Sequence, residues 1–301
     1  MSYRIETGED LSSAVRRIAA EQIDKALAEI DDRSLDTPDT VHQVRKRMKK
    51  LRGLLRIARP GLGGSYKREN VALRDAARRL SELRDSKVLL DTYDDLMGHY
   101  ADQVNRQAFA SVRRELTRQR KHLTTDGAPP EERLAEIRAA LVACRERAPR
   151  WKLDRPDART IHAGLKKTYS RARKRLEEAS HDPTPERLHQ LRKRAKYHGR
   201  HCQLLQDAWA GPIKARRREA ERLSDLLGDD HDLAVLCDTV VAAPDDFGEP
   251  ADTEALLGLA ARRRRALQGE ALPLAGRLFF ESPSDAADRL AGYWKAAAAA
   301  N

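Results

Sequence analysis

The chain of 301 residues is rich in charge and poor in aromatic residues. Lys and Arg number 58 against 47 Asp and Glu, which gives a net charge of +11, and Phe, Trp and Tyr make up 5% of the sequence. This excess of positive charge attracts polyanions. No apolar run approaches the roughly 18 residues of a membrane-spanning helix, and the first residues lack the apolar segment of a signal peptide, so we expect a soluble, cytoplasmic protein.

Amphipathic helices are predicted throughout the first half of the sequence. Apolar residues recur at helical spacing over residues 9–30, 41–59, 66–83, 86–100, 103–123 and 131–147. The second of these helices is expected to end at Arg59-Pro60-Gly61, because proline and glycine interrupt regular backbone. No stretch alternates with period two over any length, so the sequence predicts an all-α fold.

A linker with two prolines, residues 148–157, separates this half from a second half with the same order of helices. The second half is expected to contain helices over residues 158–179, 188–205, 212–227, 232–241, 253–272 and 284–295, followed by a tail over 296–301. Gly228 is expected to end the helix before it. We interpret the chain as a single domain over 1–301, built from repeats over 8–147 and 158–295.

A single offset of 147 residues aligns the two halves at several separate places. The pairs include His42 and His189, Arg45 and Arg192, Lys46 and Lys193, Arg47 and Arg194, Lys49 and Lys196, and, further on, Leu80 and Leu227, Asp85 and Asp232, and Asp91 and Asp238. Chance would not keep one register across some fifty residues. The pattern indicates an internal duplication, with a period far longer than the roughly 20 to 50 residues of solenoid repeats.

The second helix of each half carries a stripe of positive charge opposite an apolar face. At about 100° per residue, the stripes contain His42, Arg45, Lys46, Lys49 and Arg56 in the first half, and His189, Arg192, Lys193, Lys196 and Arg200 in the second. Residues 41–59 hold eight Lys or Arg and no Asp or Glu, so helical neighbours do not neutralise the charge. Packing such stripes together requires an anion, and Arg and Lys bind phosphate well. We expect both stripes to converge on a shared cavity.

The motif His42-x-x-Arg45 followed by Lys49-Lys50-Leu51-Arg52, and its counterpart His189-x-x-Arg192 followed by Lys196, resemble the CHAD family, the conserved histidine α-helical domain. The resemblance covers residues 8–295. It implies two antiparallel four-helix bundles related by pseudo-twofold symmetry around a central basic channel. It also implies binding of inorganic polyphosphate, with Lys50 and Arg52 among the ligands, and association with polyphosphate granules. The second copy departs from the first, because Tyr197-His198-Gly199 stands opposite Lys50-Leu51-Arg52.

Further cations on neighbouring helices are candidates for lining the same channel. They are Lys67, Arg74, Arg78, Lys166, Lys167, Arg171, Lys174, Lys214, Arg217 and Arg218. His42 and His189 lie at the centre of their stripes, and we expect each to donate to phosphate or to orient a basic neighbour. Adjacent cations should keep these imidazoles neutral until a polyanion binds, so that binding strengthens as the pH falls.

Nucleic-acid binding is the main alternative to polyphosphate binding, because the charge of the chain would permit it. Proteins that bind single strands stack bases on aromatic side chains, and the two stripes contain only Tyr197. No known nucleic-acid recognition motif is present. Polyphosphate is therefore the preferred ligand.

Two groups of residues resemble metal or catalytic sites. Asp229-Asp230-His231-Asp232 could hold a metal ion and activate water, but His231 corresponds to Arg84 in the first half, which favours acids that begin a helix and pair with basic neighbours. His198, His201 and Cys202 share a helix, and His198 and Cys202 fall on its apolar side, which favours core packing. We expect no enzymatic activity, metal or cofactor.

Overall fold

The computed structural model describes residues 3–80, 85–123 and 130–300. Helices make up 86% of the described residues, and these residues form no strand. The prediction of an all-α fold is confirmed. No helix in the described part is both long enough and apolar enough to cross a membrane.

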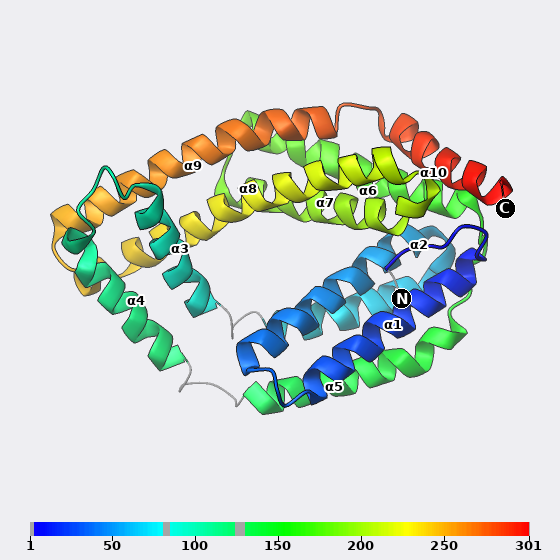
Figure 1. The fold of residues 1–301 in the computed structure, drawn as a ribbon, viewed down its shortest axis with the longest axis horizontal. Coiled ribbons are helices and arrows are strands. Elements are labelled where there is room, and N and C mark those ends of the chain that lie inside the picture. Colours follow the sequence, from blue (N-terminus) through cyan, green and yellow to red (C-terminus); the bar gives the residue numbers. More distant parts are fainter. Residues whose placement is uncertain (1–2, 81–84, 124–129, 301) are drawn as a thin grey trace.

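The described residues of the first half of the chain form five α-helices, which Figure 1 labels. They are α1 (Leu11–Asp31), α2 (Thr37–Arg79), α3 (Asp85–His99), α4 (Ala110–Leu123) and α5 (Pro130–Arg147). Acidic caps begin the first two: the Asp10 carboxylate accepts a hydrogen bond from the Ser13 amide at 2.8 Å, and Asp36 accepts one from the Asp39 amide at 2.8 Å. These caps satisfy amide donors that have no partner within the helix.

The helix α2 runs through Arg59-Pro60-Gly61 and bends at Gly63. The sequence placed this interruption at residues 59–61, a few residues too early. Proline fits a helical φ and removes only one hydrogen bond, whereas Gly63 adopts φ +50° and ψ −131°, a conformation that favours glycine. The bend folds the second part of α2 back along the first. As a result, Arg56 Nη1 donates to the Tyr66 hydroxyl at 2.8 Å.

Five α-helices also form the second half. They are α6 (Ala158–His181), α7 (Pro185–Leu204), α8 (Ala210–Ala242), α9 (Pro250–Leu278) and α10 (Pro283–Ala299). The sequence predicted that Gly228 would divide α8, but the helix is continuous there. Gly228 instead permits a close contact, because a Cβ atom at this position would lie 2.5 Å from Arg192 Nη2.

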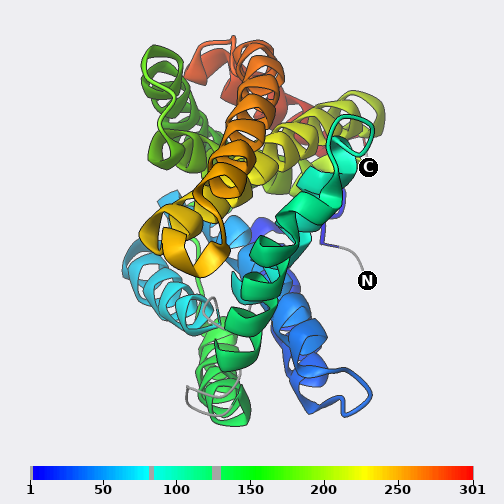
Figure 2. The same ribbon diagram turned by 90° about the vertical axis from the view of Figure 1, so that its left-hand side faces the viewer.

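Three apolar clusters form the core, and two of them combine residues from both halves of the chain. The pair α3 and α4 packs on the far ends of α8 and α9, where Tyr93, Leu236 and Leu256 belong to one cluster. Figures 1 and 2 show this pair beside the α8 and α9 end of the molecule. A second cluster joins α1, α2 and α5 to residues of α6, α7 and α10. The two halves are thus interlocked through their cores.

Candidate functional site

Two glycines allow α2 to approach the helices of the second half closely. A Cβ atom at Gly164 of α6 would lie 2.0 Å from the Ile57 carbonyl oxygen of α2. A Cβ atom at Gly53 of α2 would lie 3.1 Å from Arg200 Cβ of α7 and 2.9 Å from the Tyr3 hydroxyl. Side chains at these positions would force the helices apart. The glycines therefore bring α2, α6 and α7 together along one seam.

Arg56 connects the two halves at this seam. Its Nη2 atom donates to the Tyr197 hydroxyl at 3.1 Å, and its guanidinium carbon lies 4.1 Å from the centre of the Tyr197 ring. Further cations surround this contact on all three helices. We define the cationic cluster as Arg52 and Arg56 of α2, Arg171 of α6, and Lys193 and Arg194 of α7, placed around Tyr197.

The close spacing of positive charges shifts the pKa values of the side chains in the cluster. Burial, followed by repulsion from Arg56 and Arg171, lowers the pKa of Arg194. Burial likewise lowers the pKa values of Arg52 and Lys193. Burial alone would raise the pKa of the Tyr197 phenol, but the surrounding arginines lower it. Both effects are those expected where cations are gathered and partly removed from water.

Carboxylates neutralise many arginines elsewhere in the protein but not those of the cluster. Arg147 donates twice to the buried Glu69, at 2.8 Å each, and Arg145 pairs with Asp24 at 2.8 Å. Among the described residues, no carboxylate forms an ion pair with any member of the cationic cluster. Within the same residues, the Nε atoms of Arg56 and Arg194 are buried and have no hydrogen-bond partner. The cluster therefore has unused donors and excess positive charge.

A model of the CHAD domain family matches residues 17–241 of the chain. The chain belongs to the CHAD family. Its fold is similar to the crystal structure of the CHAD domain from the plant Ricinus communis, with 16% identity, a TM-score of 0.61, and coverage of 93% of this chain and 95% of that one. It is also similar to PptA from Streptomyces chartreusis, with 18% identity, a TM-score of 0.58, and coverage of 92% and 99%. Among curated proteins, none matches the chain.

The CHAD fold brings together only part of the residue set predicted from the sequence. Arg52, Arg56, Arg171 and Lys193 belong to the cationic cluster. Arg194 was missing from that set because it lies off the charged stripe of its own helix. The alignment of the two halves pairs Arg194 with Arg47, and this pairing was the only sequence signal for Arg194. A helical wheel drawn for one helix does not show which face of α7 contacts α2.

Three predicted ligands lie on the other side of the point where α2 and α7 cross. Lys50 has Arg47, Arg200, Lys46 and Lys25 as its electrostatic neighbours. Burial and repulsion from these cations lower the pKa of Lys50 to about 8. The stripes predicted as one site are therefore divided between two places.

The remaining predicted cations lie around the cluster or on the outer surface. Lys167 is close to Arg59 and Arg171, and repulsion from Arg59 is the main cause of its lowered pKa. Arg45 Nη1 donates to the Ala77 carbonyl at 3.4 Å, and Arg74 pairs with Asp75 at 2.8 Å. The others are the exposed Lys49, Lys67, Arg78, Lys166, Lys174, Lys214 and Arg218, the half-buried Lys196 and Arg192, and Arg217, which contacts Glu221.

His42 and His189 do not face each other. Contacts of Gly53 with Arg200 and of Arg56 with Tyr197 make α2 and α7 antiparallel at their crossing. Each histidine precedes the crossing residue of its own helix by eleven positions, or about 16 Å of helix, in opposite directions. His189 instead packs on His231 of α8, with ring centres 4.0 Å apart. The helices α2 and α7 thus come together at Arg56 and Tyr197 and not at the two histidines.

We expect His189 to be neutral at pH 7 and to gain a proton more readily when a polyanion binds. Burial, the His231 ring and two cations of α7 lower its pKa to about 4. An unfolded histidine has a pKa of about 6.5, so the unfolded chain takes up a proton at His189 before the folded protein does. His189 therefore lowers the free energy of unfolding as the pH falls from about 6.5 to about 4. In an NMR titration, polyphosphate should raise the midpoint of His189 by about one unit or more. An unchanged midpoint would contradict this role.

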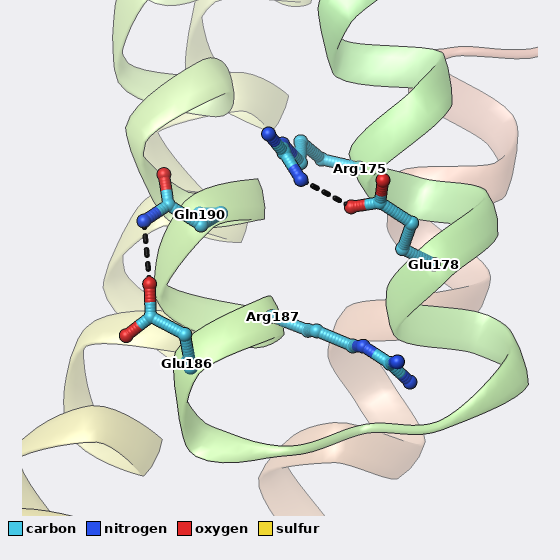
Figure 3. A pocket seen from close by; sticks show the side chains of 5 residues that line it. All are labelled: Arg175, Glu178, Glu186, Arg187 and Gln190. Carbon is cyan, nitrogen blue, oxygen red and sulfur yellow. Dashed lines mark hydrogen bonds and ion pairs between the residues drawn. The ribbon is translucent and has the colours of Figure 1, made fainter.

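A pocket of about 450 Å³ opens between α6 and α7 next to the cationic cluster (Figure 3). It is lined by Arg175, Glu178, Glu186, Arg187 and Gln190. Arg175 is an electrostatic neighbour of Arg194, which links the pocket to the cluster. Its charged groups have partners: Arg175 pairs with Glu178, Gln190 donates to Glu186, and Arg187 pairs with Asp182. The pocket is thus balanced in charge, unlike the cluster.

The acidic segment at residues 229–232 connects α8 to α9 and α7 through side-chain contacts. Asp230 is 1% exposed and accepts hydrogen bonds from Arg264 Nε at 3.1 Å and Gln268 Nε2 at 2.7 Å, both on α9. Asp232 lies 4.0 Å from Arg192 Nη1. Across the described residues, no group of three or more His, Cys, Asp or Glu side chains is arranged to hold a metal ion. Asp230 therefore serves as a structural link between two helices.

The side chains of His198, His201 and Cys202 are buried in the core. His198 Nε2 accepts a hydrogen bond from Arg216 Nε at 2.8 Å, so the ring proton of a neutral imidazole lies on Nδ1. His201 Nε2 donates to the Gly53 carbonyl at 3.2 Å, at the crossing of α2 and α7. His198 and Cys202 thus pack in the core, as their place on the helix predicts, and His201 contacts α2 at the crossing.

Proposed function

We propose that the cationic cluster binds inorganic polyphosphate. CHAD is a family associated with polyphosphate binding. The observation that carries the proposal is the gathering of five cations from α2, α6 and α7, none of which forms an ion pair with a carboxylate among the described residues. Glu186 attracts Lys193 only at longer range. Phosphate oxygens are strong acceptors that match the planar fork of arginine, and lysine adds a mobile charge. A strand of identical phosphate units would neutralise this charge and, where the arginine side chains turn toward it, would satisfy Arg56 Nε and Arg194 Nε, which are buried in the free protein.

We also propose that the two halves are repeats related by a pseudo-twofold axis, with a basic channel along their seam. Gly53 and Arg200 differ by 147 positions, which is the offset between the repeats, and these residues touch where α2 and α7 cross. Two equivalent helices that cross antiparallel at equivalent positions are the arrangement that a twofold axis generates. This coincidence supports the duplication independently of the sequence pairs.

The proposed role is that of a cytoplasmic, granule-associated or scaffold protein that holds polyphosphate without hydrolysing it. Support for binding without hydrolysis comes from Asp230, which is buried and engaged by Arg264 and Gln268. Binding of single-stranded nucleic acid is the competing proposal. The ring at the centre of the cluster favours phosphate, because the Arg56 guanidinium covers a face of Tyr197 on which a base would otherwise stack.

Competition between the two polyanions tests the proposal. Long-chain polyphosphate should displace labelled single-stranded RNA from the protein at lower phosphate concentration than RNA displaces polyphosphate, with salt held constant. The measurement is fluorescence anisotropy with each ligand labelled in turn. A preference for RNA at equal phosphate concentration would reverse the order of the two proposals. A parallel assay for phosphate release with Mg²⁺ tests the absence of hydrolysis, and steady turnover would contradict it.

A further inference from the structure

The second part of α2 runs back along the first part in a regular register. We define the return segment as residues 64–79, which follow the bend at Gly63. Three arginines of the first part donate hydrogen bonds to the return segment: Arg45 to Ala77, Arg52 to Asn70, and Arg56 to Tyr66. A step of seven or four residues along the first part matches the same step backwards along the return segment. The two parts therefore form an antiparallel helical hairpin, in which the return segment contacts two members of the cationic cluster.

A buried carboxylate fixes the return segment to α5. Glu69 is 0% exposed and accepts two hydrogen bonds from Arg147 of α5, at 2.8 Å each. Arg68 Nε donates to the same carboxylate at 2.9 Å. Glu69 lies between Tyr66 and Asn70 in the sequence, so its attachment fixes the rotation of the helix that carries both side chains. The return segment is thus a support whose orientation is set from behind.

The groups that hold the two arginines of α2 carry no charge. Arg56 donates to the hydroxyls of Tyr66 at 2.8 Å and Tyr197 at 3.1 Å, and Arg52 Nε donates to Asn70 Oδ1 at 3.4 Å. A hydroxyl or an amide oxygen accepts a hydrogen bond without cancelling the charge of the donor. A carboxylate in the same place would form an ion pair, which a polyanion would have to displace.

We infer that Tyr66 and Asn70 are positioning residues, which hold Arg56 and Arg52 in place with their charge intact before polyphosphate binds. The choice of polyphosphate as ligand rests on the proposed function. An arginine side chain has many rotamers, and ordering it on binding lowers the affinity. Acceptors that order the side chain in the free protein reduce this loss, and neutral acceptors do so without competing with the ligand.

Tyr66→Phe removes the hydroxyl and keeps the ring, and with it the contact of Arg59, whose guanidinium carbon lies 4.6 Å from the ring centre. The affinity for labelled polyphosphate should fall about five- to tenfold. The slope of log affinity against log salt should not change, because no charge is removed. In the free protein, the order parameter of the Arg56 Nε–H group, measured by ¹⁵N relaxation, should fall.

Tyr93→Phe is the matched control. It also removes a hydrogen-bonded hydroxyl, which donates to the Phe109 carbonyl at 3.0 Å in the apolar cluster of α3, α4, α8 and α9. This variant should lose stability but keep the Arg56 order parameter, and its affinity should stay within about twofold of wild type. Wild-type affinity or an unchanged Arg56 order parameter in Tyr66→Phe would overturn the positioning role.

Asn70→Asp separates a neutral support from a charged one. The new carboxylate should pair with Arg52 without loss of stability, and yet weaken polyphosphate binding about tenfold and lower the salt slope by about one. Asn105→Asp adds the same charge at an exposed position, where the side chain accepts from the Gln107 amide at 3.0 Å, and should change affinity less than about threefold. Equal losses in both variants would contradict a specific role for the neutral amide.

Failure of the positioning role and failure of the proposed function give different results. If wild type binds polyphosphate and Tyr66→Phe binds it equally well, the positioning role alone is overturned. If wild type does not bind polyphosphate, the proposed function is overturned. The Arg56 order parameter is measured without ligand, so it tests the hold of Tyr66 on Arg56 in either case.

Discussion

Replacement of Arg56 and Arg194 together by glutamine should weaken polyphosphate binding by about two orders of magnitude or more. Each guanidinium has a buried Nε without a partner in the described part of the chain, and each lies among other cations of the cluster. A hydrogen bond to a charged group contributes about 1.5 to 3 kcal/mol, so two losses correspond to roughly 3 to 6 kcal/mol. The measurement is the dissociation constant of labelled polyphosphate at fixed salt.

The matched control is Arg138→Gln/Arg145→Gln. The control also removes two positive charges. However, Arg138 pairs with Asp31 at 3.0 Å and Arg145 pairs with Asp24 at 2.8 Å, both on the outer surface. Affinity in the control should stay within a few fold of wild type. The slope of log affinity against log salt should fall by about two in Arg56→Gln/Arg194→Gln. An equal loss of affinity in both double variants would mean that net charge, and not the cluster, governs binding.

Gly164→Ala should destabilise the protein by about 3 kcal/mol, at the upper end of the cost of overpacking. A Cβ atom there would lie 2.0 Å from the Ile57 carbonyl oxygen and 2.7 Å from its carbonyl carbon. Both are backbone atoms, so no side-chain rotation relieves the clash and α6 must move away from α2. The shift should also separate Arg171 from Arg194 and weaken polyphosphate binding. Chemical denaturation in urea measures the loss of stability.

Gly258→Ala is the control for this substitution. Gly258 lies within α9, is exposed, and has no atom within 4 Å of the position that a Cβ would occupy among the described residues. Alanine is the better helix former, so this change should stabilise the protein by about 0.5 to 1 kcal/mol. If Gly164→Ala proved as stable as Gly258→Ala, the close approach of α2 and α6 would not be what positions the cluster.

The sequence predicted the fold class, most of the helices and four of the five members of the cationic cluster, because helical periodicity and charge are local to one helix. Arg56 could be chosen from the wheel of its own helix and Arg52 from the resemblance to the CHAD family, but Arg194 depends on which side of α7 meets α2. Glycines were harder to interpret. Gly228 was predicted to end a helix, yet it accommodates Arg192, and Gly63 rather than Pro60 marks the bend. A sequence gives the conformational freedom of glycine but not the neighbour that uses it.

The interlocked core has a consequence for synthesis of the chain. The apolar residues of α3 and α4, up to Leu116, are buried against a partner surface that begins near Leu233. At translation speeds of about 5 to 20 residues per second, the ribosome needs on the order of ten seconds to add the intervening segment. During that interval the nascent hairpin exposes Tyr93 and Phe109 to other chains. Exposed apolar side chains of this kind make the pair α3 and α4 a candidate for binding by a chaperone during synthesis.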